Sequence, residues 1–282
     1  MSLTSYRAAP PRGRRKAQVR ECGRGCKIHF ENCSSAVTGN DFETSNLHGQ
    51  AVPKMEFITT RGGVRLKQHG VVVSELRSTA GPTHSVFDVL AALMVALPTS
   101  GDAALLGFSA GGMVAPLAAL GWELPLAAVD LDAKAFAVFR RLCPQWQSRV
   151  KFYRAEAGEW LRRRRIRFGM LVEDLSVPEA GDVVKPTVSW GDLPELIRRR
   201  LHPEGVAVFN LLPYPKRPWG RSIPPVRGRF RAALELRFRD YENRILIVGE
   251  RLPSARCLAS RLRRLLRELG SRQAGRIRVY MR

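Results

Sequence analysis

Residues 105–117 read LLGFSAGGMVAPL, and this stretch decides how the rest of the chain is interpreted. An apolar run ends at Gly107, a turn of small residues follows, and a helical pattern begins near Gly112. Residues 107–111 spell Gly-Phe-Ser-Ala-Gly, the pattern of the elbow that presents the nucleophile of serine hydrolases. The same order of strand, turn and helix is typical of loops at which a nucleotide approaches the backbone. Ser109 is therefore a candidate nucleophile in one interpretation and part of a cofactor loop in the other.

The stretch opens an alternation of apolar strands and helices that continues along the chain. Strands that are buried on both faces read as continuous apolar runs, and helices between them imply parallel neighbours. The pattern predicts a doubly wound, mostly parallel α/β sheet within residues 83–282. We expect strands at 103–108, 125–131, 150–155, 168–175, 205–212, 244–250 and 276–282, and helices at 83–98, 112–121, 133–143, 157–165, 193–201 and 255–269.

The chain before this alternation divides into two parts. Short β-type runs separated by RGG and HG predict a small antiparallel β unit over residues 55–82. Residues 1–54 are rich in Arg, Gly, Ser and Asn and show neither helical nor alternating periodicity. Such a segment buries too little apolar surface to offset the entropy of ordering it. We expect a disordered basic leader or a wrongly assigned start, with the folded protein beginning near Met55.

The hydrolase interpretation requires an acid and then a histidine after Ser109 in chain order. Only His202 follows, in a predicted turn that precedes a strand. In a parallel sheet such a turn lies at the edge opposite the carboxyl ends of the strands, where catalytic groups gather. A serine hydroxyl without an adjacent base is a poor nucleophile, which disfavours a hydrolase that uses Ser109.

The cofactor interpretation requires acids at the carboxyl ends of successive strands. Asp130 ends the strand that follows the loop, Glu156 follows the next strand, and Asp174 ends the one after that. Each acid alone suits a helix cap or a first helical turn. Together they fall at the edge where such sheets bind ligands, which favours a bound cofactor.

These motifs together resemble the class I S-adenosylmethionine-dependent transferases, in particular their spermidine synthase-like branch. The resemblance implies a methyltransferase-like Rossmann variant that binds S-adenosylmethionine or its decarboxylated form. It implies that Gly107, Gly111 and Gly112, with Ser109 in the same loop, approach the cofactor. It further implies that Asp130 binds the ribose, that Glu156 faces the adenine amine, and that Asp174 activates the attacking amine as the catalytic residue.

The chain departs from the pattern of that branch at three places. Ser109 and Ala110 stand where the branch usually has Gly and Asp, and Val177 replaces the acid that would hold a polyamine. A polyamine is a polycation and needs a negative pocket, for which Glu173 and its neighbours Glu179 and Asp182 are the local candidates. The sequence therefore does not identify the acceptor. It leaves open whether a methyl or an aminopropyl group is transferred.

The composition bears on partners and on location. The formal net charge is +22, from 47 basic and 25 acidic residues, which favours an anionic partner such as nucleic acid or reflects a bias toward Arg codons. Residues 212–231 mix prolines, basic residues and aromatic residues, which suits a semi-rigid connection or a loop for single-stranded nucleic acid. No long apolar run indicates a membrane span, and we expect a cytoplasmic protein. The sequence does not decide whether the chain forms a homodimer.

The cysteines do not indicate a metal centre or a disulfide framework. Cys22, Cys26 and Cys33, with His29 between them, are of the types that bind zinc. The usual Cys-x2-Cys pair is missing and no second ligand pair follows, so we expect no metal.

The sequence thus predicts a small-molecule or macromolecular nucleophile as the acceptor of a SAM-dependent transferase. The alternatives are an RNA methyltransferase, which would explain the charge, and a cofactor-binding homologue that has lost catalysis, which would explain Ser109, Ala110 and Val177. A serine hydrolase is the least favoured of the interpretations.

Overall fold

The computed structural model describes residues 56–60, 62–68, 71–97, 100–179, 182–214 and 217–282. The predictions for residues 1–54, including the zinc-type residues Cys22, Cys26, His29 and Cys33, lie outside these ranges. Among the described residues, no group of three or more His, Cys, Asp or Glu side chains is placed to hold a metal ion. No helix in the same ranges has the length and apolarity that a membrane span requires.

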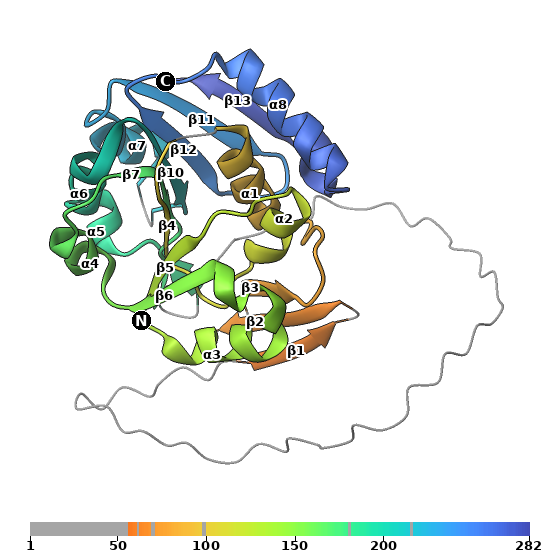
Figure 1. Cartoon of the computed structure of the whole chain (residues 1–282). Coiled ribbons are helices and arrows are strands. Elements are labelled where there is room, and N and C mark those ends of the chain that lie inside the picture. The colour runs from red at the N-terminus through yellow and green to blue at the C-terminus, as the bar shows by residue number, and fades with distance from the viewer. Residues whose placement is uncertain (1–55, 61, 69–70, 98–99, 180–181, 215–216) are drawn as a thin grey trace, which may run out of the picture. The chain divides into compact units, whose positions relative to one another are not determined.

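The centre of the fold is an eight-stranded sheet with the order β13-β11-β12-β10-β7-β4-β5-β6 (Figure 1). Strands β6, β5, β4, β7 and β10 are parallel, whereas β12 runs antiparallel to β10 and β11, and β13 antiparallel to β11. This order confirms the predicted doubly wound, mostly parallel sheet. The strands are β4 (Ala103–Leu106), β5 (Leu126–Asp130), β6 (Val150–Arg154), β7 (Phe168–Glu173), β10 (Leu201–Leu211), β11 (Ala232–Phe238), β12 (Arg244–Gly249) and β13 (Ile277–Met281).

Helices cover both faces of the sheet and bury a separate apolar cluster on each (Figure 1). One cluster joins α1, α2, α3 and α8 to the sheet, and the other joins α4, α5, α6 and α7 to it. Parallel strands that are buried on both faces need this double cover. The helices are α1 (Val86–Ala96), α2 (Val114–Ala119), α3 (Ala133–Leu142), α4 (Ala157–Arg163), α5 (Thr187–Trp190), α6 (Leu193–Arg200), α7 (Trp219–Arg227) and α8 (Ala255–Glu268), with short 3-10 turns η1 (Pro144–Arg149) and η2 (Arg272–Gly275).

A three-stranded antiparallel sheet precedes α1, as predicted. It consists of β1 (Glu56–Thr60), β2 (Gly63–Gln68) and β3 (Val71–Arg77). Leu66 and Leu76 of this sheet are buried in the same apolar cluster as α1. The small sheet therefore shares a core with the large one, while the division of the chain at residues 82 and 83 stays a prediction.

The structure differs from the prediction between residues 212 and 231. This stretch was expected to be an irregular connection, but it contains α7, with Pro224 and Pro225 inside the helix. Ile223 and Val226 are buried in the second apolar cluster, and this burial outweighs the missing N–H groups of the prolines. Strand β11 was also missed, as was the hairpin of β8 (Val177–Glu179) and β9 (Asp182–Val184).

Candidate functional site

The predicted loop lies where β4 ends, beside the carboxyl end of β7. Gly107 has φ +93, and a Cβ atom there would lie 2.5 Å from the backbone oxygen of Asp174. Its N–H donates to the Val129 oxygen at 2.8 Å. A left-handed backbone without a side chain is what lets the loop lie against the end of the neighbouring strand. The structure thus brings the start of the loop and Asp174 together.

The carboxylate of Asp130 holds the middle of the loop. Its Oδ2 accepts a hydrogen bond of 2.7 Å from the backbone N–H of Ser109, and its Oδ1 accepts one of 2.9 Å from the N–H of Asp132. Burial raises the pKa of Asp130 to about 6, although the hydrogen bonds from Asp132 and Ser109 act in the opposite direction. Asp130 is thus a buried acid beside the loop, with a pKa raised above its ordinary value.

Leu131, which follows Asp130, is 37% exposed, in contrast to the buried side chains of the loop. An exposed aliphatic side chain beside a nearly buried carboxylate offers an apolar surface next to a strong acceptor. Sequence reasoning missed Leu131, because a single apolar residue after a strand carries no distinctive signal.

Ser109 does not have the surroundings of a nucleophile. Its side chain is fully buried, and its hydroxyl oxygen has no hydrogen-bond partner among the described residues. His202 is exposed and lies at the start of β10, at the edge of the sheet opposite the loop. Among the described residues no base lies within hydrogen-bond reach of the Ser109 hydroxyl, which disfavours the hydrolase alternative.

The other predicted cofactor residues lie nearby but are engaged with the protein. A Cβ atom on Gly111 would lie 2.7 Å from the ring of Phe108, and one on Gly112 would lie 2.8 Å from the ring of Phe87. Glu156 is the N-cap of α4 and accepts hydrogen bonds of 2.9 and 2.7 Å from the N–H groups of Gly158 and Glu159. The structure thus assigns these three residues packing and capping roles, and their contacts with a cofactor stay predictions.

Asp174 is buried at the carboxyl end of β7. Its Oδ1 accepts a 2.7 Å hydrogen bond from Nδ2 of Asn210, whose Oδ1 in turn accepts a 3.0 Å bond from Nδ2 of Asn243. Its Oδ2 has no partner among the described residues. Burial raises the pKa of Asp174 well above its ordinary value, and the charge of Lys185 and the hydrogen bond from Asn210 lower it by less. Asp174 is thus oriented by a hydrogen bond at Oδ1, whereas its Oδ2 is buried without a hydrogen-bond partner among the described residues.

Sequence reasoning missed the two asparagines. Asn210 interrupts the apolar run GVAVFNLL, and a lone amide in a buried strand was the available signal. Asn243 lies in the turn between β11 and β12, and its role depends on a strand pairing that the sequence pattern did not reveal.

Glu173 forms a buried ion pair and does not offer a free negative charge. Its Oε1 lies 2.8 Å from Nζ of Lys185, and both side chains are at most 1% exposed. Ser189 donates to the same oxygen at 2.9 Å, and Lys185 also donates to the Leu175 backbone oxygen at 2.7 Å. Since Lys185 neutralises Glu173, this acid does not supply the negative pocket that a polyamine would need.

Replacing Lys185 with methionine is expected to destabilise the fold by about 3 kcal/mol, because it leaves the buried carboxylate of Glu173 without its counter-charge. Chemical denaturation measures this loss. The double variant Lys185→Met with Glu173→Gln is expected to recover most of it. Equal destabilisation in the single and double variants would contradict the argument.

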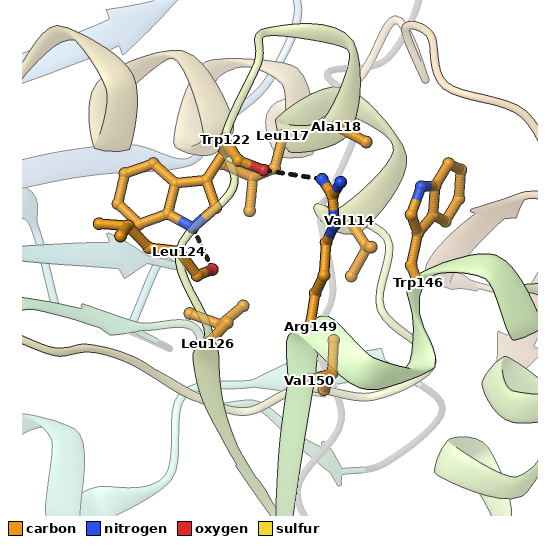
Figure 2. A pocket seen from close by; sticks show the side chains of 9 residues that line it. All are labelled: Val114, Leu117, Ala118, Trp122, Leu124, Leu126, Trp146, Arg149 and Val150. Atoms are coloured by element: carbon orange, nitrogen blue, oxygen red, sulfur yellow. Dashed lines mark hydrogen bonds between the residues drawn. The ribbon is translucent and has the colours of Figure 1, made fainter.

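A pocket at the other edge of the sheet is distinct from this site. Figure 2 shows it where β5 and β6 begin, with Nη1 of Arg149 donating to the Trp122 backbone oxygen at 3.2 Å. None of the predicted site residues lines it. Its lining residues are Val114, Leu117, Ala118, Trp122, Leu124, Leu126, Trp146, Arg149 and Val150.

Comparisons with known proteins bear on the fold. No family model matches the sequence, and no curated protein matches it. Among solved structures, human methyltransferase-like protein 13 in complex with SAH matches with a TM-score of 0.51 and 18% identity, over 67% of this chain and 92% of that one. Spermidine synthase from Thermotoga maritima matches with a TM-score of 0.54 and 12% identity, over 74% and 73% of the two chains.

The chain has the class I methyltransferase fold. A SAM-dependent methyltransferase from Agrobacterium tumefaciens also matches, with a TM-score of 0.50 and 14% identity over 73% of each chain. The resemblance predicted from the loop and the three acids is confirmed at the level of the class I methyltransferase fold. At these identities the likeness establishes the fold, and the ligand of this chain needs its own evidence.

Proposed function

We propose that the chain binds S-adenosylmethionine or its decarboxylated form at the loop after β4 and transfers a methyl or an aminopropyl group to an acceptor. The observation that carries this proposal is the Asp130 carboxylate at the end of β5, held 2.7 Å from the Ser109 N–H and followed by the exposed Leu131. A carboxylate at this place suits ribose hydroxyls, and an aliphatic side chain beside it suits a flat base.

The backbone of the loop after β4 supports the proposed binding of the cofactor. Ser109 has φ +50, a left-handed conformation in which glycine is the usual residue. The loop therefore keeps the backbone shape of a glycine-rich loop although Ser109 and Ala110 depart from its usual residues. In this proposal Gly107, Gly111 and Gly112 let the backbone approach the cofactor, and Glu156 lies near its base.

Asp174 is the residue we propose for catalysis. When bound, the cofactor supplies an electrophilic carbon next to a sulfonium sulfur. Asn210 holds Oδ1 of Asp174 at 2.7 Å, and we propose that the buried Oδ2, which has no partner among the described residues, takes the proton from the attacking nucleophile. Burial raises the pKa of this carboxyl, which makes it a stronger base when it is ionised.

Two alternatives and three further expectations stand beside this proposal. An enzyme that uses RNA as its acceptor would explain the net charge, and loss of catalysis would explain Ser109, Ala110 and Val177. A cytoplasmic location, a homodimer and the division of the chain into residues 1–54, 55–82 and 83–282 rest on the sequence. The neutralised Glu173 makes a polyamine the less favoured acceptor.

Calorimetry with each form of the cofactor across a pH series tests the proposal. Ribose hydroxyls donate to the ionised form of Asp130, whose pKa is about 6. The affinity is therefore expected to rise roughly tenfold between about pH 5 and about pH 7.5 and to change little above that range.

The outcomes separate the alternatives. Absence of heat with both cofactors would remove the proposal. Binding without transfer to any acceptor would support the homologue that has lost catalysis, and an RNA affinity that falls steeply with salt would support the RNA methyltransferase.

A further inference from the structure

A hollow of about 400 Å³ lies where β11 ends and β12 begins. This is the edge of the sheet that also carries Asp174. Arg237 and Arg244 line this hollow and are directly opposite each other in the antiparallel ladder of the two strands. Like charges at directly opposite positions destabilise a sheet. This pairing therefore calls for a compensating negative charge, from the protein or from a ligand.

Glu235 supplies part of the compensation. Its buried carboxylate accepts hydrogen bonds from Arg237, Arg282 and Arg244, the last at 2.8 Å. Burial acts to raise the pKa of Glu235, but the hydrogen bonds from Arg282 and Arg237 outweigh it and lower the pKa. Glu242 also lines the hollow. The lining of the hollow itself thus carries two guanidinium groups, Arg237 and Arg244, and one carboxylate, Glu242.

Aromatic rings line the same hollow. Trp219 lies under the guanidinium of Arg244, with 4.8 Å between the guanidinium carbon and the ring centroid. Phe238 and Tyr241 are also among the lining residues, with their ring centroids 5.5 Å apart. Guanidinium groups bind phosphate oxygens in bidentate fashion, and partly exposed aromatic rings bind flat rings. The hollow thus combines the two kinds of group that recognise a nucleotide.

Asn243 connects the hollow to the proposed catalytic residue. It lines the hollow, and its Nδ2 donates to Oδ1 of Asn210. Nδ2 of Asn210 in turn donates to Oδ1 of Asp174. We propose that this hollow binds a phosphate-bearing acceptor of the nucleotide type, with Arg237 and Arg244 on the phosphate and the aromatic side chains on the ring. The assignment of this ligand as the acceptor rests on the proposed transferase function, whereas the binding itself does not.

Titration of the full chain with uridine 5′-monophosphate tests the proposal, because this probe lacks the adenine of the cofactor. Arg237→Gln and Arg244→Gln are each expected to weaken binding at least tenfold, since each removes a charged phosphate contact. Glu242→Gln is expected to strengthen it, because it removes a negative charge from the lining. Arg263→Gln, on the exposed face of α8, is the matched control and is expected to bind as the wild type does.

Three results would overturn the proposal: no binding of uridine monophosphate, unchanged affinity in both arginine variants, or tighter binding of putrescine than of the nucleotide. The Glu242→Gln arm keeps the test valid if an arginine variant fails to fold, because a gain in affinity does not come from unfolding.

Two further arms identify the source of the phosphate and separate this proposal from the transferase function. A ten-residue uridine oligonucleotide that binds much more tightly than the monomer, and loses affinity in the same arginine variants, indicates RNA. Equal affinities indicate a free nucleotide. Nucleotide binding without binding of S-adenosylmethionine would refute the transferase function alone, and the reverse result would refute this hollow alone.

Discussion

Asp130→Ala is expected to weaken binding of S-adenosylmethionine about 1,000-fold, because two hydrogen bonds from ribose hydroxyls to a carboxylate are lost at about 2 kcal/mol each. The variant also removes the acceptor that holds the Ser109 N–H at 2.7 Å. Asp130→Asn keeps one acceptor oxygen and is expected to bind with intermediate affinity. Calorimetry at about pH 7.5, where the wild-type carboxyl is ionised, measures both.

Asp132→Ala is the matched control for this experiment. Asp132 lies two residues from Asp130, but its side chain caps α3 by accepting a 2.8 Å hydrogen bond from the Lys134 N–H. Its removal is expected to lower stability by about 1 kcal/mol and to leave the cofactor affinity unchanged. If the Asp132 and Asp130 variants lose affinity to the same extent, the loss reflects the local fold and the assignment of Asp130 fails.

Gly107→Ala is expected to destabilise the protein by about 4 kcal/mol, a fall of roughly 10 °C in the melting temperature. The backbone at this position is left-handed, and the new Cβ atom would lie 2.5 Å from the Asp174 backbone oxygen. Because the contact is with backbone, the clash is relieved only by moving β7 or the loop. Thermal unfolding measures the loss, and any folded fraction is expected to bind the cofactor weakly.

Gly121→Ala separates the cost of the left-handed backbone from the cost of the clash with Asp174. Gly121 has φ +77, close to the φ of Gly107, but a Cβ atom there meets nothing within 4 Å. Its replacement is expected to cost only about 1 kcal/mol, the price of the left-handed backbone alone. Similar melting temperatures for the Gly107 and Gly121 variants would show that the close approach to Asp174 contributes nothing.

Much of the fold was predictable because its central strands and helices obey simple periodicity. The strand containing Leu105 and the helix containing Leu90 carry strong, local apolar patterns, and the structure has both. The strand β11 was missed although AALELRF alternates apolar and charged residues, because prolines upstream suggested an irregular connection. Helix α7 forms despite Pro224 and Pro225 through contacts with the sheet, which are not local in sequence.

The residues of the candidate site that lie at the ends of strands could be predicted from the sequence. Asp130 and Asp174 follow from the rule that ligands bind at the carboxyl ends of parallel strands. The partners of Asp174 and Glu173 were not predictable. Asn210 is 36 residues from Asp174 in the sequence, and Lys185 is 12 residues from Glu173. Such pairings depend on strand order and on a hairpin, which the local pattern does not encode.

The left-handed backbone of Ser109 has a consequence for how relatives of this chain are to be sought. At such a position the loop requires a conformation rather than a particular letter, and serine adopts it at a cost of about 1 kcal/mol. The loop therefore has serine where glycine is the usual residue, while its backbone stays left-handed. The chain as a whole shows the same contrast, since its shape matches solved structures at 12% to 18% identity while no family model matches its sequence.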